Sequence, residues 1–378
     1  MNVRPDFSAT QRPIEAARHT PGFVYTSPEV LAREKERLFL KDWLCVGRVD
    51  EFPNAGDYRA FRLLDEPVLI VKDAAGTLNA FANVCQHRGV EIASGGGNVK
   101  EFMCPYHGWL YDWQGQLVGA PYMKEAEGFD PKTCRLPRLK LETWVGWVFV
   151  SFDPAAPPLV AFLGEIAATF EVMRQQDLRT AYTFEITLDC NWKFVCENLL
   201  DFYHADTLHS ATIGAYYVTD RSRYRLLPRG SFVTTYKTNT QVDGGKPLFG
   251  PIPWVADNGE DFAINGYLAP NLSLFARCDN INGYMTWPLG PDRCRMICYH
   301  LIPPAFFADP DYDRKIQRYR VFQQRVLEED RGMIASLQRG MYSRSYAPGP
   351  MSVREIAIHH AINGHLDRVF GPEARAAE

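Results

Sequence analysis

Cys85-Gln86-His87-Arg88-Gly89 is one of two short segments that decide the fold of this chain, and the other is Cys104-Pro105-Tyr106-His107-Gly108-Trp109. Each segment contains one cysteine, one histidine and a glycine that allows a tight turn. Sixteen residues separate His87 from Cys104. Two thiols and two imidazoles from two neighbouring loops can bind a metal centre, so the candidate ligands are Cys85, His87, Cys104 and His107.

Two kinds of metal centre suit these four ligands. A [2Fe-2S] cluster of the Rieske type takes two cysteines on one iron and two histidines on the other, which raises its potential above that of an all-cysteine cluster. A structural zinc ion also accepts two cysteines and two histidines, but zinc fingers and ribbons place the paired cysteines about two to four residues apart. Here each loop pairs a cysteine with a histidine, so the spacing favours the cluster.

The composition is that of a globular protein, with 46% hydrophobic and 23% charged residues in a chain of 378. A net charge of -4 offers no general attraction to nucleic acid, and no basic run stands out. The N-terminus lacks an apolar signal segment, and no stretch of about twenty apolar residues can span a bilayer. We therefore expect a cytoplasmic protein that binds neither nucleic acid nor membrane.

The region between about residues 40 and 153 is predicted to form an all-β domain. Strand patterns cover residues 66–72, 78–84 and 144–151. The proline-rich stretch 153–158 can continue neither a central strand nor a helix interior. We therefore place a domain boundary after residue 153.

The remainder, residues 154–378, is predicted to be an α+β domain. A helical pattern near 159–176 leads to a strand at 182–188, a helix from about Trp192, several strands between 224 and 302, and a long helix beginning near Asp311. An antiparallel sheet with helices can enclose a cavity.

A second group of polar residues with metal-binding chemistry lies at the start of this domain. On a continuous helix, Glu197, Asp201 and His204 would share one face, so that a carboxylate touches the imidazole. His204 and His209 are five residues apart, which leaves them roughly 140° apart around an ideal helix. They can bind one metal only if the helix ends or bulges between them. Taken alone, the two histidines are better interpreted as ordinary polar residues at a helix end.

The two groups together resemble those of the Rieske non-haem iron aromatic ring-hydroxylating oxygenases, in their terminal oxygenase alpha subunit. The resemblance runs from about Trp43 to Gly340. It implies an N-terminal segment at 1–39, a Rieske [2Fe-2S] domain at 40–153, and a helix-grip (START/SRPBCC-like) catalytic domain at 154–378, on which that segment packs. The matching residues are Arg88-Gly89, Pro105-Tyr106, Asn191-Trp192-Lys193, Glu197-Asn198, Asp201, His204 and His209.

The family's mononuclear Fe(II) needs a carboxylate in addition to His204 and His209. Within a helix over 313–341, Asp330 falls near the middle of an apolar arc, and an unpaired carboxylate on a buried face is costly. Asp330 therefore requires a metal, a cation such as arginine, or a proton, and Glu329 near the edge of the arc is next in line. The family often has an acidic residue where Ala335 stands here. The arc consists of Tyr319, Phe322, Val326, Met333, Leu337 and Met341.

The resemblance also implies roles and partners. Asp201 and Asn198 are the expected catalytic residues, and Asp201 is expected to join His204 to a cluster-binding histidine of a neighbouring subunit in a homotrimer. Electrons would come from NADH through a ferredoxin, a reductase or both. O2 would be the cosubstrate, a small organic molecule the substrate, and a separate beta subunit a possible partner.

Three functions remain open. The preferred one is hydroxylation, dihydroxylation or oxidative N- or O-dealkylation of an aromatic compound in its catabolism. The alternative is a Rieske monooxygenase of a quaternary ammonium compound of the betaine, carnitine or choline type, since aromatic cages bind such cations. The non-enzymatic alternative is a zinc-stabilised helix-grip ligand carrier. Candidate pocket aromatics are Phe202, Tyr216, Tyr217, Phe249, Trp254, Phe262 and Trp287.

Overall fold

The structure, a computed structural model, describes residues 5–371, except the side chains of Ala215 and of residues 218–221. Its contacts divide the chain into two compact units. The β unit is Leu40–Phe162, and the α+β unit combines the residues up to Phe39 with those from Leu163 onward. No helix within residues 5–371 is long and apolar enough to cross a membrane.

The β unit extends past the boundary expected after residue 153. Trp43 donates a hydrogen bond from Nε1 to the carbonyl of Pro157 at 2.7 Å. The backbone N–H of Leu159 donates to the Glu142 carboxylate at 2.9 Å. The proline-rich stretch therefore stays attached to the β unit, because its backbone groups have partners there.

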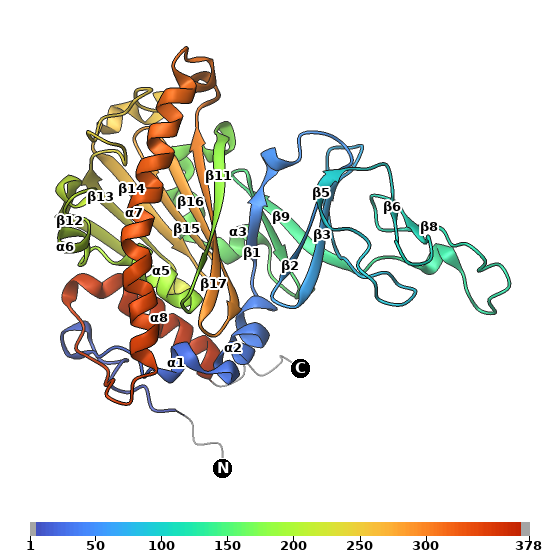
Figure 1. Ribbon diagram of the computed structural model, residues 1–378, viewed down its shortest axis with the longest axis horizontal. Helices are drawn as coiled ribbons and strands as arrows, with labels where there is room; N and C mark the ends of the chain where they lie inside the picture. Colours follow the sequence, from blue (N-terminus) through green and yellow to red (C-terminus); the bar gives the residue numbers. More distant parts are fainter. Residues whose placement is uncertain (1–4, 372–378) are drawn as a thin grey trace. The chain divides into compact units, whose positions relative to one another are not determined.

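The β unit is built on an antiparallel seven-stranded sheet with the order β1-β10-β9-β4-β3-β2-β5, and β6-β7-β8 form a second, smaller sheet. Figure 1 shows both sheets. The strands are β1 Leu44–Arg48, β2 Asp57–Leu63, β3 Glu66–Lys72, β4 Leu78–Ala82, β5 Gly95–Asn98, β6 Phe102–Met103, β7 Leu110–Tyr111, β8 Leu117–Gly119, β9 Arg138–Trp144 and β10 Trp147–Ser151.

The single strand expected over 144–151 was wrong, because a tight turn divides it. Trp144 ends β9, and Trp147 begins β10 directly opposite it. Val145 and Gly146 connect the strands with φ angles of 42° and 87°. Two-residue hairpins need positive φ at such positions, which glycine adopts without strain. The apolar pattern runs across the turn and conceals it.

The α+β unit contains a second antiparallel seven-stranded sheet, with the order β11-β17-β16-β15-β14-β13-β12. The expected α+β class is confirmed. The long helix α7 crosses one face of this sheet (Figure 1). The strands are β11 Arg179–Leu188, β12 Tyr217–Leu226, β13 Phe232–Thr238, β14 Phe262–Leu268, β15 Leu272–Arg277, β16 Ile281–Gly290 and β17 Arg293–Ile302.

The α-helices differ from expectation mainly between residues 159 and 176, where short pieces replace one helical stretch. The helix expected from Trp192 ends at Leu200, and the one expected near Asp311 begins at Tyr312. The α-helices are α1 Phe23–Thr26, α2 Pro28–Glu34, α3 Leu159–Leu163, α4 Glu165–Thr169, α5 Trp192–Leu200, α6 Ala205–Leu208, α7 Tyr312–Met341 and α8 Ile356–Phe370.

The buried side of α7 follows the predicted arc only as far as Asp330, which is 5% exposed. Beyond it, Met333 and Leu337 are exposed, contrary to expectation, and Ile334 and Gln338 are buried instead. Gln338 turns inward because its Oε1 accepts from the backbone N–H of Asn191 at 2.7 Å. Polar contacts at the start of α5 therefore set the buried side of this half of α7.

The N-terminal segment packs against α5 through a buried ion pair. Glu34 accepts from Lys193 Nζ at 2.6 Å and from Trp192 Nε1 at 2.8 Å. Burial raises the pKa of Glu34, but Lys193 and His365 together outweigh burial and lower that pKa to about 2. Glu197 accepts from the Tyr25 hydroxyl at 2.9 Å, and burial raises its pKa to about 7. Trp192, Lys193 and Glu197 thus anchor the N-terminal segment.

Candidate functional site

The two cysteine–histidine loops of the β unit share one backbone pattern. The N–H of each cysteine donates to the carbonyl five positions later, at 2.8 Å for Cys85 and 2.7 Å for Cys104. The N–H of each loop glycine donates back to its cysteine, at 2.8 Å for Gly89 and 3.1 Å for Gly108. The two glycines have φ angles of 77° and 70°, which side chains rarely allow. The glycines noted in the sequence are thus required by these turns.

The four candidate cluster ligands converge between these loops. His87 Nδ1 and His107 Nδ1 lie 3.1 Å apart, and both rings are exposed. Cys85 and Cys104 are each 2% exposed, and their thiols contact each other. Burial and the neighbouring Cys85 raise the pKa of Cys104, so ionised thiolates here need a cation. Buried thiolates with outward imidazoles match the ligand set of a Rieske cluster.

Two aromatic side chains border the candidate cluster site. The Tyr111 hydroxyl accepts from the backbone N–H of Gln86 at 3.0 Å and lies 3.5 Å from Cys85 Sγ. With that acceptor site occupied, its own proton can point toward the sulfur. Trp109 stacks on His87, with ring centroids 4.9 Å apart and 9° between the planes. Trp109 therefore covers one face of this imidazole.

The second candidate site begins where α5 ends. Asp201 follows Leu200, the last residue of α5, in an extended conformation, so Glu197, Asp201 and His204 do not share one helix face as expected. Instead, Asp201 Oδ1 accepts from the backbone N–H of Tyr203 at 2.7 Å. His204 and His209 then flank the short helix α6. The helix end that the histidine spacing required is present.

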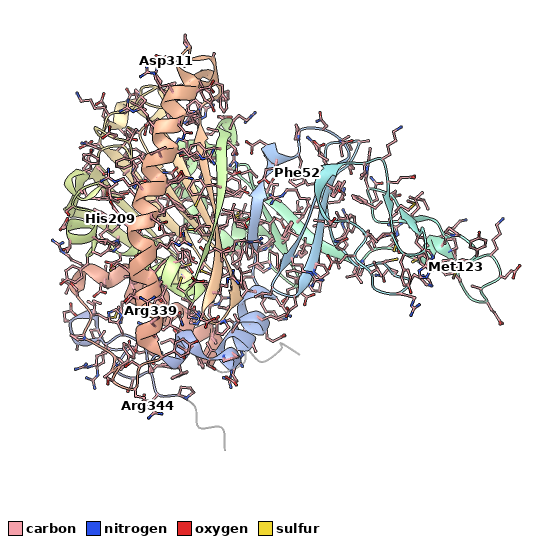
Figure 2. All side chains as sticks on the ribbon, viewed as in Figure 1. Phe52, Met123, His209, Asp311, Arg339 and Arg344 are labelled. Carbon is pink, nitrogen blue, oxygen red and sulfur yellow. The ribbon has the colours of Figure 1, made fainter. Side chains whose placement is uncertain are left out.

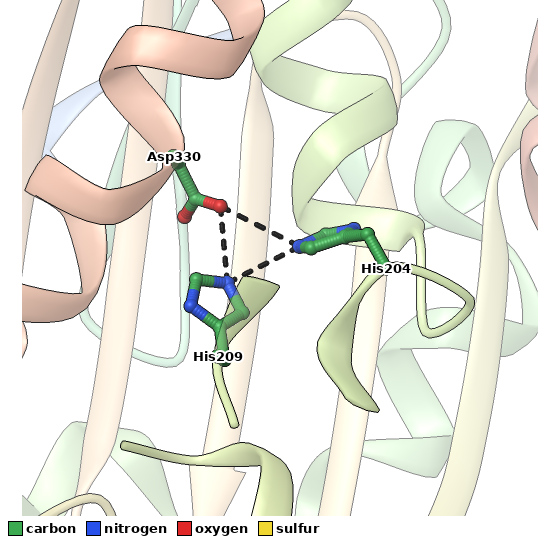
Figure 3. A group of neighbouring side chains, drawn as sticks. All are labelled: His204, His209 and Asp330. Carbon is green, nitrogen blue, oxygen red and sulfur yellow. Dashed lines mark hydrogen bonds and ion pairs between the residues drawn. The ribbon is translucent and has the colours of Figure 1, made fainter. Parts of the chain in front are cut away.

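His204, His209 and Asp330 of α7 meet at one point (Figure 3). The two Nε2 atoms are 3.2 Å apart, and Asp330 Oδ1 lies 3.0 Å from that of His209 and 3.4 Å from that of His204. Oδ1 is buried and has no hydrogen-bond partner among the described residues. The three atoms therefore face one point, and no hydrogen bond from a described residue satisfies Oδ1. This arrangement fits a metal ion that keeps further coordination positions open.

The protonation of these groups also fits a metal. Burial lowers the pKa of His204, but Asp201 and Asp330 outweigh it and raise that pKa to about 9. Burial raises the pKa of Asp330, but the two imidazoles outweigh burial and lower it. Without a metal, protons on the imidazoles therefore balance the buried carboxylate. A divalent cation replaces them, because ligation requires neutral imidazole.

Each imidazole of this site is held by a carboxylate on its far nitrogen. His204 Nδ1 lies 3.0 Å from Asp201 Oδ2. His209 Nδ1 lies 2.7 Å from Glu329 Oε2, which also accepts from the Thr212 hydroxyl at 2.7 Å. Such partners fix the tautomer and direct Nε2 toward the metal. Glu329, the reserve candidate for the third ligand, thus holds His209 instead, and sequence reasoning missed this contact.

Asn198 of α5 contacts the same centre from the other side. Its side chain hydrogen-bonds Asp330 and helps to lower the pKa of that carboxylate. His209 lies beside α7, whose ends are marked in Figure 2 by Asp311 and Arg339. The ligand atoms of His204, His209 and Asp330 all lie within 4.8 Å of one another.

A cavity adjoins the three residues, with an empty volume of about 520 Å³ including its open mouth. Aromatic rings and amides line it together, namely Phe202, Tyr217, Phe275, Tyr284, Gln241 and Gln323.

Of the aromatic residues proposed for a pocket, Phe202 and Tyr217 line this cavity. Others belong to the core or its edge: Phe249 stacks on Tyr319 at 6.1 Å, and Trp254 donates from Nε1 to a backbone carbonyl at 3.0 Å. The sequence analysis missed Phe275, Tyr284, Gln241 and Gln323. The strand register that brings these residues together cannot be seen in any one segment.

Two models of known protein families match this chain. Residues 175–369 match the family of the ring hydroxylating alpha subunit (catalytic domain). The chain belongs to this alpha subunit family. Residues 42–140 of the alpha subunit match the Rieske [2Fe-2S] domain. It is therefore an oxidoreductase with a Rieske cluster and a mononuclear iron that uses O2, and the zinc-stabilised carrier is excluded.

Relatives of this alpha subunit act on two kinds of compound. Choline monooxygenase of Arabidopsis thaliana is 29% identical, over 92% of this chain and 82% of its own. The carnitine monooxygenase oxygenase subunit of Acinetobacter pittii is 27% identical, over 86% of each chain. The alpha subunit of 2-aminobenzenesulfonate 2,3-dioxygenase from Alcaligenes sp is 36% identical, over 55% of this chain and 54% of its own.

Solved structures share the fold of the alpha subunit along nearly its whole length. A quaternary ammonium Rieske monooxygenase that oxidises carnitine superposes with a TM-score of 0.82 at 24% identity, covering 98% of this chain and 100% of its own. Naphthalene 1,2-dioxygenase from Rhodococcus sp. superposes with a TM-score of 0.78 at 20% identity, covering 94% and 95%. The same architecture thus serves both kinds of substrate.

Proposed function

We propose that this chain is the terminal oxygenase of a multicomponent system that oxidises a small quaternary ammonium compound. The observation that carries the proposal is the similarity to choline monooxygenase along 92% of the chain, joined by a carnitine monooxygenase subunit. These relatives support the alternative of the sequence analysis better than its preferred aromatic substrate. Aromatic dioxygenases also match, including a biphenyl dioxygenase alpha subunit over 91% of the chain, and they define the competing function.

The cavity chemistry supports a cationic head group. Phe202, Tyr217, Phe275 and Tyr284 line it, and the faces of such rings attract quaternary ammonium groups. Asp201, which is not one of the proposed metal ligands, also lines the cavity and adds negative charge. An aromatic hydrocarbon would fit the rings but would gain nothing from this carboxylate.

We assign the cluster to Cys85, His87, Cys104 and His107, and the mononuclear iron to His204, His209 and Asp330. Bound iron in such a site supplies the activation of O2. The chain's own residues do the positioning: Asp201 and Glu329 hold the imidazoles, and Asn198 holds the Asp330 carboxylate. The buried position of Asp330 and His209 keeps water away from two of the three ligands.

Electron delivery is proposed to require an assembly of subunits. Asp201 is partly exposed while it holds His204, and His87 and His107 are exposed in the β unit. An exposed carboxylate on one chain can therefore accept a hydrogen bond from an exposed cluster histidine of another. We propose a homotrimer in which Asp201 makes this contact, with electrons drawn from NADH through a ferredoxin, a reductase or both. A separate beta subunit is not required by this arrangement.

A substrate panel tests the proposal. The purified holoenzyme is supplied with NADH and a surrogate reductase, and O2 uptake and oxidised products are measured with choline, glycine betaine, carnitine, biphenyl and naphthalene. We expect substrate-dependent uptake and a hydroxylated or dealkylated product with at least one quaternary ammonium compound. Turnover restricted to the aromatic hydrocarbons would overturn the proposal in favour of the aromatic function.

A further inference from the structure

Arg277 is a buried guanidinium beside the cavity of the α+β unit. It ends β15, and only 1% of it is exposed. It lies on the same face of the strand as Phe275, two residues earlier, which lines the cavity. Nη1 donates to Asn265 Oδ1 at 3.0 Å, and Nη2 donates to the Tyr217 hydroxyl at 3.4 Å. Because Tyr217 also lines the cavity, Arg277 lies directly behind its wall.

The guanidinium of Arg277 makes no direct ion pair with a carboxylate among the described residues. The guanidinium stacks on the ring of Tyr236 at 5.2 Å and on that of Phe275 at 5.6 Å. Its Nε has no hydrogen-bond partner among these residues. Arginine stays protonated inside proteins. Burying such a charge is costly unless an opposite charge pairs with it, so this position favours an anion from outside the chain.

Asp279, two residues further on, is engaged elsewhere. Its carboxylate accepts from the Thr240 hydroxyl at 2.6 Å, from Asn280 Nδ2 at 2.8 Å and from the Tyr319 hydroxyl. Burial raises the pKa of Asp279, whereas the hydrogen bonds from Thr240 and Tyr319 and the charge of Arg277 act to lower it. The hydrogen bonds of this carboxylate thus go to other side chains, and it acts on Arg277 only through its charge.

A chain of hydrogen bonds aims a second donor at the same part of the cavity. Burial lowers the pKa of His300 to about 3, so its ring is neutral, and Nδ1 donates to Asn282 Oδ1 at 2.7 Å. Asn282 Nδ2 donates to Gln241 Oε1 at 3.4 Å, and Gln241 Nε2 donates to the Tyr217 hydroxyl at 3.1 Å. The Tyr217 oxygen thus accepts from both Gln241 and Arg277. The Tyr236 side chain is a further hydrogen-bond neighbour of this hydroxyl. Because Tyr217 lines the cavity, its proton can also turn toward a ligand there.

We infer that the substrate carries a carboxylate, or a sulfonate of similar shape, which binds the Tyr217 hydroxyl and the positive charge of Arg277 behind it. The inference rests on the proposed function and narrows it to a zwitterion with a quaternary ammonium group at one end and the anion at the other. Hydrogen bonds to an ionised acceptor are about twice as strong as neutral ones. A substrate with a positive charge alone, such as choline, would meet an uncompensated guanidinium.

Equilibrium binding to the anaerobic holoenzyme tests this inference. Calorimetry compares glycine betaine and carnitine with their carboxamides, which keep the shape and the ammonium group but lose the negative charge. Benzoate and benzamide form a second pair without the ammonium group. We expect each carboxylate of the quaternary pairs to bind roughly 10- to 100-fold more tightly than its carboxamide. Equal affinities within those pairs would overturn the inference.

Variants assign the preference to the proposed residues. Arg277→Gln should remove most of the carboxylate preference while leaving carboxamide affinity nearly unchanged. Arg277→Lys should retain part of the preference, and Tyr217→Phe should weaken carboxylate binding several-fold. Arg295→Gln, on the opposite face of the same sheet, is the matched control and should bind like the wild type. A carboxylate preference that survives Arg277→Gln would overturn the assignment; if that variant does not fold, Arg277→Lys and Tyr217→Phe decide.

The two proposals fail in different ways. If choline and the carboxamides bind as tightly as the betaines, the quaternary ammonium function stands and the anion site is wrong. If no quaternary compound binds but benzoate binds more tightly than benzamide in an Arg277-dependent manner, the anion site stands and the quaternary ammonium function is wrong. Cluster absorbance and thermal unfolding of each variant verify that it is folded.

Discussion

The two proposed metal centres differ in how the chain brings their proposed ligands together. The four cluster residues lie between residues 85 and 107, on two loops of one small unit. At the iron site, His204 and His209 follow α5, but Asp330 comes from α7, more than a hundred residues later. The first centre is assembled by local turns, and the second by the packing of a whole unit.

The surroundings of the two pairs of imidazoles differ as well. Those of His204 and His209 are each held by a carboxylate, Asp201 or Glu329. The imidazoles of His87 and His107 are exposed and have no carboxylate partner among the described residues. Partial desolvation, together with the charges of His87 and Arg88, lowers the pKa of His107. The iron site is thus pre-arranged by its neighbours, whereas the cluster site is left open to a partner.

The largest effect is expected for Asp330→Ala. This variant should lose the mononuclear iron and essentially all turnover, because two neutral imidazoles alone bind iron weakly, while the cluster ligands lie in the other unit. Iron per chain and the visible absorbance of the cluster measure the two centres separately. Glu328→Ala, at an exposed position of the same helix, is the control and should retain both. Normal mononuclear iron in Asp330→Ala would show that another acidic residue is the ligand.

Asp201→Asn should keep both centres filled but lose nearly all product formation. An amide fills the same space but does not hold the imidazole as a charged acceptor or accept a hydrogen bond from a second chain as strongly. The measurement is a single turnover with the cluster reduced beforehand, following cluster oxidation with substrate and O2. Asp206→Asn, an exposed residue of α6, is the matched control. Wild-type rates of cluster oxidation in Asp201→Asn would reduce Asp201 to a structural role.

Much of the first centre and part of the second could be predicted from the sequence. The proposed cluster residues could be predicted because each loop holds its cysteine, histidine and glycine within a single turn. No long-range contact is needed to bring the ligands of one loop together. Asp330 was accessible through helical periodicity, since a carboxylate on an apolar arc needs a partner. Its geometry agrees with the prediction because α7 is regular through that point.

The rest depends on contacts between segments that are far apart. The shared face of Glu197, Asp201 and His204 was wrong because α5 ends at Leu200, where Asp201 bonds the backbone of Tyr203. The buried positions of Gln338 and Arg277 could not be predicted either. Gln338 is buried because it accepts a hydrogen bond from the start of α5, and Arg277 because strand pairing places it beside Asn265. The helix α8 also went unpredicted.

A smaller effect is expected for Glu329→Gln. The variant should bind the mononuclear iron about 10- to 100-fold more weakly, because the amide is a poorer acceptor for His209 Nδ1 and for Thr212. Iron release to a chelator, followed over time, measures this affinity without reference to activity. Glu328→Gln is the matched control. Since no cluster ligand is touched, any loss of cluster absorbance would mean that the change acts through folding.

The smallest effect is expected for Tyr111→Phe, which tests whether the Tyr111 hydroxyl contributes to the reduction potential of the cluster. The Tyr111 hydroxyl accepts from the backbone N–H of Gln86 and lies 3.5 Å from Cys85 Sγ, so its proton can stabilise negative charge on the sulfur. Hydrogen bonds to cluster sulfurs raise the reduction potential, because the reduced cluster carries the extra electron. Removing this one should lower the potential by on the order of tens of millivolts in a redox titration, with iron content and mononuclear iron unchanged. Tyr106→Phe removes a hydroxyl that faces Arg88 instead of a sulfur, and should leave the potential unchanged. Equal potentials for both variants and the wild type would mean that the imidazoles and their exposure, without help from Tyr111, set the potential of this centre.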